Sequence, residues 1–299
     1  GLEMQPSRLW AMRGEIFGLG FAQVLVAMGA LSLVGITLGY PVGASLISGT
    51  GFVLTSTAIV MQMLEERKEM STPRGRRIVS ILLFEDLAIV PLLALVTFLA
   101  PGGEEVTLAQ RLTGAAIGIG SIAALIVGGL YLLNPFFSLL ARFGGREVMT
   151  AAALLVVLGS ALLMQAGGLS MAMGAFLAGV LLSESTFRHQ LEADVEPFRG
   201  LLLALFFLGV GMALNLTTIA ENWLLIVICV PAYMILKMLV IYCVARIWKA
   251  NKAEALERAV LMAQGGEFAF VLYAAAAGAG VITQQDRAVL TAIVIVSMV

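Results

Sequence analysis

The sequence predicts an all-α polytopic membrane protein with two helical triplets of opposite topology, each containing a broken central helix. Three observations support this fold class. The 299 residues are 60% hydrophobic and only 12% charged, whereas a soluble domain carries about 25% charged residues. Apolar runs of about 20 residues, long enough to cross a bilayer, recur along the chain. Basic residues are concentrated in alternate connections between these runs.

The apolar runs predict ten membrane spans, and the charges between them predict their orientation. The approximate bounds of the spans are 16–38, 41–63, 77–100, 110–133, 146–166, 169–185, 199–216, 222–246, 257–278 and 286–299. If residues 1–15 are cytoplasmic, the connections on that side hold 15 of the 18 Lys and Arg residues, and the other side holds only Arg111 and Arg287. This asymmetry predicts the orientation by the positive-inside rule. It also supports the number of spans, because one missed helix would reverse the sides of all later connections and remove the asymmetry.

The first three and the last three spans predict an inverted repeat. The central span of the first triplet is interrupted at Thr55, Ser56 and Thr57, and that of the second at Gln264-Gly265-Gly266-Glu267. Broken helices at matching positions of two inverted triplets indicate a transporter with its site near the bilayer midplane. The alternative interpretation is that these small and polar residues only permit close helix packing.

The repeat divides the chain into four predicted segments. Residues 1–110 hold the first triplet, 111–140 a linker helix, 141–216 further helices, and 217–299 the second triplet. The chain does not begin with Met and ends within an apolar run. We therefore interpret both ends as cuts, so that the last helix is truncated.

Four ionisable residues lie at membrane depth: Glu85, Asp86, Lys237 and Glu267. A carboxylate there costs roughly 2.5–3.5 kcal/mol, and such residues mark ion pathways or proton relays, or pair with one another. Glu85 and Asp86 are adjacent and therefore point about 100° apart on a helix. Asp86 is the predicted ion ligand. Glu85 would contact Lys237 or belong to the proton relay.

This set of residues suits the exchange of a monovalent cation for a proton. Asp86 can supply a carboxylate ligand, and Thr55, Ser56 and Thr57 can supply hydroxyl and backbone oxygens. Burial favours the protonated form of a carboxylate, whereas a nearby cation favours the ionised form. One site could then hold a proton or a cation but not readily both, and antiport requires no more than that competition. The sequence contains no Cys/His cluster of the kind that binds zinc, and its net charge of −1 does not indicate binding to nucleic acid.

Longer motifs resemble a known family. The stretches Leu83–Asp86, Gly168–Leu182 and Gln264–Val271 are similar to the monovalent cation:proton antiporter family, which contains the sodium/hydrogen exchangers. Within that family, the run His189–Gly200 resembles the central cytoplasmic loop of the Kef-type glutathione-gated potassium efflux systems. The resemblance implies a sodium/proton-antiporter-like fold of thirteen helices, of which about three would precede Gly1. It also implies that the two discontinuous helices cross.

The resemblance further implies roles for particular residues and partners. The ion-site acid of the family falls on Asp86 and its cationic helix position on Lys237. The spans between 141 and 216 would belong to a dimerisation domain, which implies a homodimer. The expected activity is exchange of K⁺ or Na⁺ for H⁺ by alternating access in a bacterial inner membrane, without enzymatic chemistry.

The cytoplasmic connection at 184–200 is the implied regulatory surface. Its residues His189, Glu192, Asp194 and Glu196 would contact a soluble nucleotide-binding domain that senses glutathione, and an ancillary subunit is a further implied partner. On sequence alone, this stretch is equally well interpreted as a solvated connection. No glycine-rich βαβ fingerprint occurs, so no cofactor is expected in this chain. Glutathione and nucleotide are implied only for a missing domain.

Glu85 is a departure from the family pattern, because Kef-type proteins usually carry Gln at this position. The substitution leaves the charge stoichiometry and the choice between K⁺ and Na⁺ open. Three alternatives remain at this point. They are a ligand-gated cation channel, a Na⁺/H⁺ antiporter without glutathione control, and a membrane scaffold without transport activity.

Overall fold

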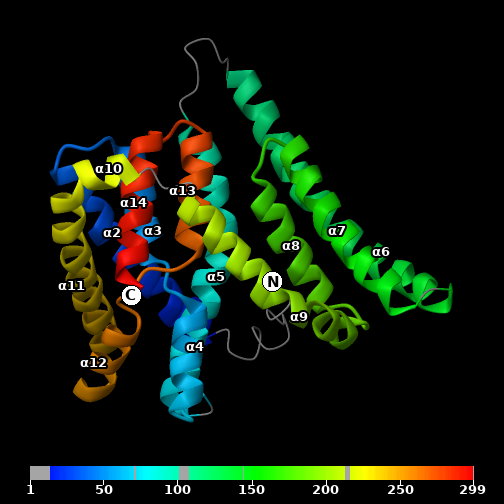
Figure 1. The fold of residues 1–299 in the computed structure, drawn as a ribbon, viewed down its shortest axis with the longest axis horizontal. Helices are drawn as coiled ribbons and strands as arrows, with labels where there is room; N and C mark the ends of the chain where they lie inside the picture. Colours follow the sequence, from blue (N-terminus) through cyan, green and yellow to red (C-terminus); the bar gives the residue numbers. More distant parts are fainter. Residues whose placement is uncertain (1–13, 71, 101–107, 144, 213–215, 299) are drawn as a thin grey trace. The chain divides into compact units, whose positions relative to one another are not determined.

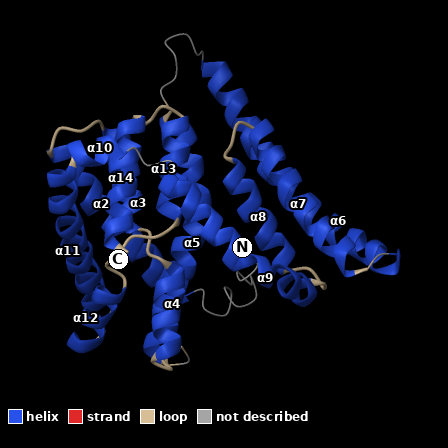
Figure 2. Cartoon of the chain, viewed as in Figure 1, coloured by secondary structure: helices blue, strands red, loops and turns tan. Residues whose placement is uncertain are grey.

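A computed structural model describes residues 14–70, 72–100, 108–143, 145–212 and 216–298. The described residues form helices joined by loops, and Figure 2 shows no strand among them. The chain divides into two compact units. Unit 1 comprises residues 1–11 and 102–211, and unit 2 comprises residues 12–101 and 212–299.

The described residues of unit 1 form four helices. They are α6 (Leu108–Phe143), α7 (Arg146–Ala166), α8 (Met171–Ser183) and α9 (Arg188–Met212). Helices α6, α7 and α8 pack against one another around a small core that includes Phe137, Met149 and Leu182. The prediction of a loop over 184–200 was wrong in part, because α9 begins at Arg188. An ion pair from Arg188 to Glu192, four residues later, supports this first helical turn.

Unit 2 is assembled from both ends of the described chain (Figure 1). Its helices are a π-helical turn η1 (Glu15–Gly20), α2 (Phe21–Thr37), α3 (Val42–Val53), α4 (Thr57–Glu66), α5 (Pro73–Leu99), α10 (Leu216–Glu221), α11 (Trp223–Ile247), α12 (Lys252–Leu261), α13 (Phe268–Gly278) and α14 (Gln284–Ser297). Helix α3 packs against α2 and α13, α13 packs against α5, and α11 packs against α2, α12 and α14.

Both predicted interruptions are present in unit 2. The chain leaves the helix between α3 and α4, at residues 54–56, and again between α12 and α13, at residues 262–267. At the first break, a side chain at the start of the new helix compensates for a missing backbone bond. The hydroxyl of Ser56 accepts from the Ile59 amide at the start of α4, whereas α13, which follows the second break, has no side-chain cap. The inverted symmetry of the two triplets and the crossing of their helices stay predictions.

Six helical segments of the described residues are long and apolar enough to cross a membrane. They are Glu15–Thr37, Val42–Glu66, Pro73–Leu99, Ala116–Arg142, Glu147–Ala166 and Trp223–Ile247. Helix α9 adds a seventh if its two parts, bent by 52°, count as one span. The remaining predicted spans correspond to α8, α14 and the interrupted pair α12–α13, which are shorter. The ten predicted spans were defined by apolar runs, which continue across helix breaks and turns. An unbroken helical span needs about 20 residues, and the helices in these three predicted spans are shorter than that.

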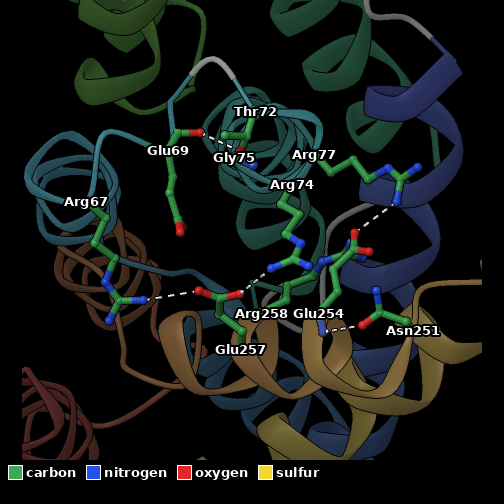
Figure 3. Close-up of polar contacts among 10 residues, drawn as sticks. All are labelled: Arg67, Glu69, Thr72, Arg74, Gly75, Arg77, Asn251, Glu254, Glu257 and Arg258. Carbon is green, nitrogen blue, oxygen red and sulfur yellow. Dashed lines mark hydrogen bonds and ion pairs between the residues drawn. The ribbon is translucent and has the colours of Figure 1, made fainter.

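Ion pairs join one end of α12 to α4 and α5, as Figure 3 shows. Glu254 accepts from Arg77 at 2.9 Å and from Arg258 at 3.3 Å. Glu257 accepts from Arg67 at 3.2 Å and pairs with Arg74 at 3.7 Å. We call these six residues the α12 ion-pair cluster. The sequence predicted only a role in membrane orientation for Arg67, Arg74 and Arg77, but the structure shows that they also join α12 to α5 and to the end of α4.

The two glutamates of the α12 ion-pair cluster differ in burial, and this difference predicts unequal effects on stability. The side chain of Arg258 is only 2% exposed, so Glu254→Gln would leave a buried guanidinium without its carboxylate. We expect the free energy of unfolding to fall by about 3 kcal/mol, the cost of breaking a buried ion pair. Thermal unfolding of purified protein in a single detergent would measure the difference.

Glu257→Gln is the matched control for this experiment. The partners of Glu257, Arg67 and Arg74, are 49% and 48% exposed, so water replaces the lost contacts and the expected loss is below about 1 kcal/mol. Adding Arg258→Met to the Glu254→Gln variant removes the unpaired charge and should recover most of the stability. Equal effects of the two glutamine substitutions would contradict the prediction.

Candidate ion-binding site

The two helix breaks of unit 2 contact each other through Gly266. A Cβ atom at this position would lie 2.6 Å from both the carbonyl carbon and the carbonyl oxygen of Thr55, and 3.0 Å from the amide nitrogen of Ser56. Real Cβ atoms are not found so close to backbone atoms, and these backbone atoms cannot rotate away as a side chain can. Glycine is therefore required for the approach of the two breaks.

Lys237, on α11, is buried at this junction and contacts both breaks. Its Nζ donates to the backbone oxygen of Gln264 at 2.9 Å, to Thr55 Oγ1 at 3.1 Å and to the backbone oxygen of Leu54 at 3.4 Å. Leu54 caps the C-terminus of α3, and Gln264 follows the C-terminus of α12. Helix C-termini carry partial negative charge, so the ammonium group compensates the end of α3 and also binds a free carbonyl of the second break.

Glu85 reaches Lys237 through Thr55. The carboxylate of Glu85 is buried, and its Oε2 accepts from the Thr55 amide at 2.7 Å. The same threonine accepts from Lys237 through its hydroxyl. The predicted contact between Glu85 and Lys237 is thus made through an intervening residue, which places the negative charge of Glu85 close to a compensating positive charge. Thr55, one of the predicted ion ligands, is occupied by these two contacts.

Asp86 has a different environment from its neighbour. It is half-buried, and its Oδ1 accepts from the hydroxyl of Thr57 at 3.1 Å. Thr57 is the first residue of α4, and Ser56 caps that helix. Helix N-termini carry partial positive charge, which stabilises a nearby carboxylate. Asp86 therefore lies beside the positive end of one half-helix, and no lysine or arginine pairs with it among the described residues.

The second break supplies further polar groups. The amide of Gly265 donates to Ser297 Oγ at 3.0 Å, while the backbone oxygen of Gln264 is taken by Lys237. Two buried side-chain atoms, Nε2 of Gln264 and Oε2 of Glu267, have no hydrogen-bond partner among the described residues. Glu267 immediately precedes α13, and its side chain does not cap that helix.

The predicted regulatory residues belong to unit 1. His189 is exposed and lies 3.7 Å from Glu192. Asp194 is buried and accepts from Thr150 of α7 at 3.3 Å, so the carboxylate expected on a contact surface is directed into the unit. The side chain of Glu196 lies outside the described part of the structure.

The structure therefore brings together the predicted residues of both breaks with Glu85, Asp86 and Lys237. Sequence reasoning predicted backbone oxygens from Thr55, Ser56 and Thr57, but it missed the amide of Thr55 and the carbonyl oxygens of Leu54 and Gln264. A residue sequence can indicate that a helix is broken, but the direction of the freed amide and carbonyl groups depends on the backbone path.

Buried charges at contacting breaks of two helices, within a multi-pass helical membrane protein, are characteristic of ion-coupled transporters. Comparison with known families gives a corresponding result. A family model described as "Sodium/hydrogen exchanger, transmembrane" matches residues 1–299, and the chain belongs to this family, whose members are transporters rather than enzymes.

Individual relatives agree with this assignment. The chain is 55% identical over 299 residues to a glutathione-regulated potassium-efflux system protein of Haemophilus influenzae. The match covers all of this chain and 48% of that protein, so the chain spans about half the length of the relative. The fold is similar to the sodium proton antiporter MjNhaP1 of Methanocaldococcus jannaschii, with a TM-score of 0.69 at 15% identity, over 99% of this chain and 78% of that structure.

Proposed function

We propose that this chain forms the membrane part of a secondary transporter that exchanges a monovalent cation for a proton by alternating access. The cation and the proton compete for Asp86. The observation that carries the proposal is the contrast between the two adjacent acids. Glu85 is held by the Thr55 amide and lies near Lys237, whereas Asp86 meets only the hydroxyl of Thr57 in the described contacts. Asp86 is therefore the carboxylate that is free to take a proton or a cation.

We propose K⁺ as the physiological cation, with Na⁺ as the alternative. The support is the similarity to a protein named as a potassium-efflux system. The oxygen ligands of the site serve either ion, so the residues themselves do not favour one of them. The length of that relative also supports a further part of the protein, and we propose that it is a cytoplasmic nucleotide-binding domain that gates the transporter in response to glutathione. A homodimer in a bacterial inner membrane completes the proposal.

Ion exchange by the full-length protein in liposomes is the direct test. A pH-sensitive dye is enclosed, and KCl or NaCl is added outside while an imposed proton gradient is followed. An antiporter dissipates the gradient only when a transported cation is present, and the rate saturates with cation concentration. A cation channel, the alternative class, carries cations without obligatory proton movement. Cation flux that is independent of the proton gradient would overturn the proposal.

A further inference from the structure

Three carboxylates and one ammonium group lie at the two helix breaks, and their environments differ. The charge of Glu85 is compensated, because Thr55 connects it to Lys237. Asp86 has one hydroxyl donor, from Thr57. Glu267 is the third acid, and its buried Oε2 has no hydrogen-bond partner among the described residues. Because an unpaired carboxylate is expensive at membrane depth, its environment requires an explanation.

The backbone places Glu267 beside the N-terminus of α4. The preceding residue, Gly266, packs directly on the backbone of Thr55 and Ser56. Thr57, the next residue along α4, holds Asp86. Helix α13, which begins immediately after Glu267, packs against α5, the helix that carries Asp86. The backbone segments that carry the two acids therefore meet at the same end of one half-helix, where like charges that lie close together repel each other.

The side chain of Glu267 neither caps a helix nor forms a hydrogen bond at its buried oxygen in the described part of the structure. It does not cap α13. Its Oε2 is buried and has no hydrogen-bond partner among the described residues. Burying a carboxylate oxygen with neither a donor nor a positive charge is unfavourable. A proton or a cation at this oxygen would remove the penalty, and a cation placed between two carboxylates would satisfy both.

We propose that Glu267 is the second carboxylate of the exchange site and that Asp86 and Glu267 bind the transported cation together. This inference rests on the proposed function.

Glu267→Gln distinguishes this role from a structural one. Glutamine has the shape of a protonated glutamate, so if Glu267 only packs in its neutral form, the variant should exchange cations like the wild type. If Glu267 is a cation ligand, the KM for KCl and for NaCl should rise about tenfold or more, the effect of losing one charged ligand. The maximal rate at saturating cation should change far less. Exchange by the full-length protein in liposomes, over a range of concentrations of each salt, gives both quantities.

Two further variants keep the test decisive. Glu66→Gln removes an exposed carboxylate from the far end of α4 and should leave both kinetic constants unchanged. Glu267→Asp keeps the charge on a shorter side chain, and its KM should lie between those of the wild type and the glutamine variant. If the glutamine variant does not fold, an unchanged KM in the aspartate variant overturns the inference.

The outcomes separate this inference from the proposed function. A wild-type protein that exchanges cations for protons, together with a glutamine variant of unchanged KM, would remove Glu267 from the site and leave the antiporter proposal standing. A wild-type protein without cation-coupled proton movement would overturn the proposed function itself.

Discussion

Asp86→Asn is expected to reduce cation-coupled proton movement to the background of protein-free liposomes. Asparagine preserves the volume of the side chain and can still accept the hydrogen bond from Thr57. It can neither take up a proton nor offer a negative charge to a cation, so residue 86 no longer binds either of the two exchanged ions. Because the substitution removes a half-buried charge without stranding a partner, the protein should remain folded. Dye-monitored exchange in liposomes measures the loss, and thermal unfolding in detergent checks the fold.

The matched control is Glu66→Gln, which also converts a carboxylate to an amide but at an exposed position of the same unit. It should retain the wild-type rate. Undiminished cation flux through Asp86→Asn, uncoupled from pH, would favour a channel over an antiporter. Loss of exchange in both variants would point to damage during reconstitution rather than to the loss of one group.

Lys237→Met is expected to have the largest effect on stability. Methionine fills a similar volume but cannot donate to the backbone oxygens of Leu54 and Gln264, and it leaves the buried carboxylate of Glu85 without a nearby positive charge. Breaking such a buried pair costs about 3–5 kcal/mol. We expect a corresponding fall in the free energy of unfolding, measured by thermal unfolding in detergent. Exchange should fall as well, because the two helix breaks lose their common donor.

The destabilisation by Lys237→Met should depend on pH with a definite sign. Protonation of Glu85 removes the unpaired charge, so in this variant the folded state takes up a proton that the unfolded state releases more readily. Stability then decreases as pH rises, and the deficit should be smaller at about pH 5 than at about pH 8. The double variant Lys237→Met with Glu85→Gln should lose this dependence. A deficit equal at both pH values would show that Glu85 is not the group left unpaired.

Much of the fold was predictable because the bilayer limits what a chain can do. An α-helix satisfies its backbone groups within a single segment in hydrocarbon, so long apolar runs of about 20 residues predict helices such as α5 and α11. The two interruptions were predictable for the same reason, because polar residues inside a membrane-spanning run are costly and are retained where they have a functional or structural role. The predicted span over 169–185 contains α8 (Met171–Ser183). The error lies in the polar stretch after Arg188, which was interpreted as a connection but is the first part of α9, because hydropathy does not reveal a polar helix.

The candidate site was predictable as a set of residues but not as a set of contacts. Asp86, Glu85, Lys237 and Glu267 stand out because each is costly in an apolar run. Their pairing follows from the backbone. The amide of Thr55 binds Glu85, and its hydroxyl binds Lys237, so a residue expected to hold the ion instead joins two charges.

The sequence by itself determined that this protein is a helical membrane protein with two broken helices and a small group of ionisable residues at their depth. Those features depend on the cost of exposing polar groups to hydrocarbon, which composition and spacing reveal. Only the tertiary structure decided which acid is compensated and which is available. That distinction depends on Gly266, which lets one break pack on the other and so sets which groups lie within hydrogen-bonding distance.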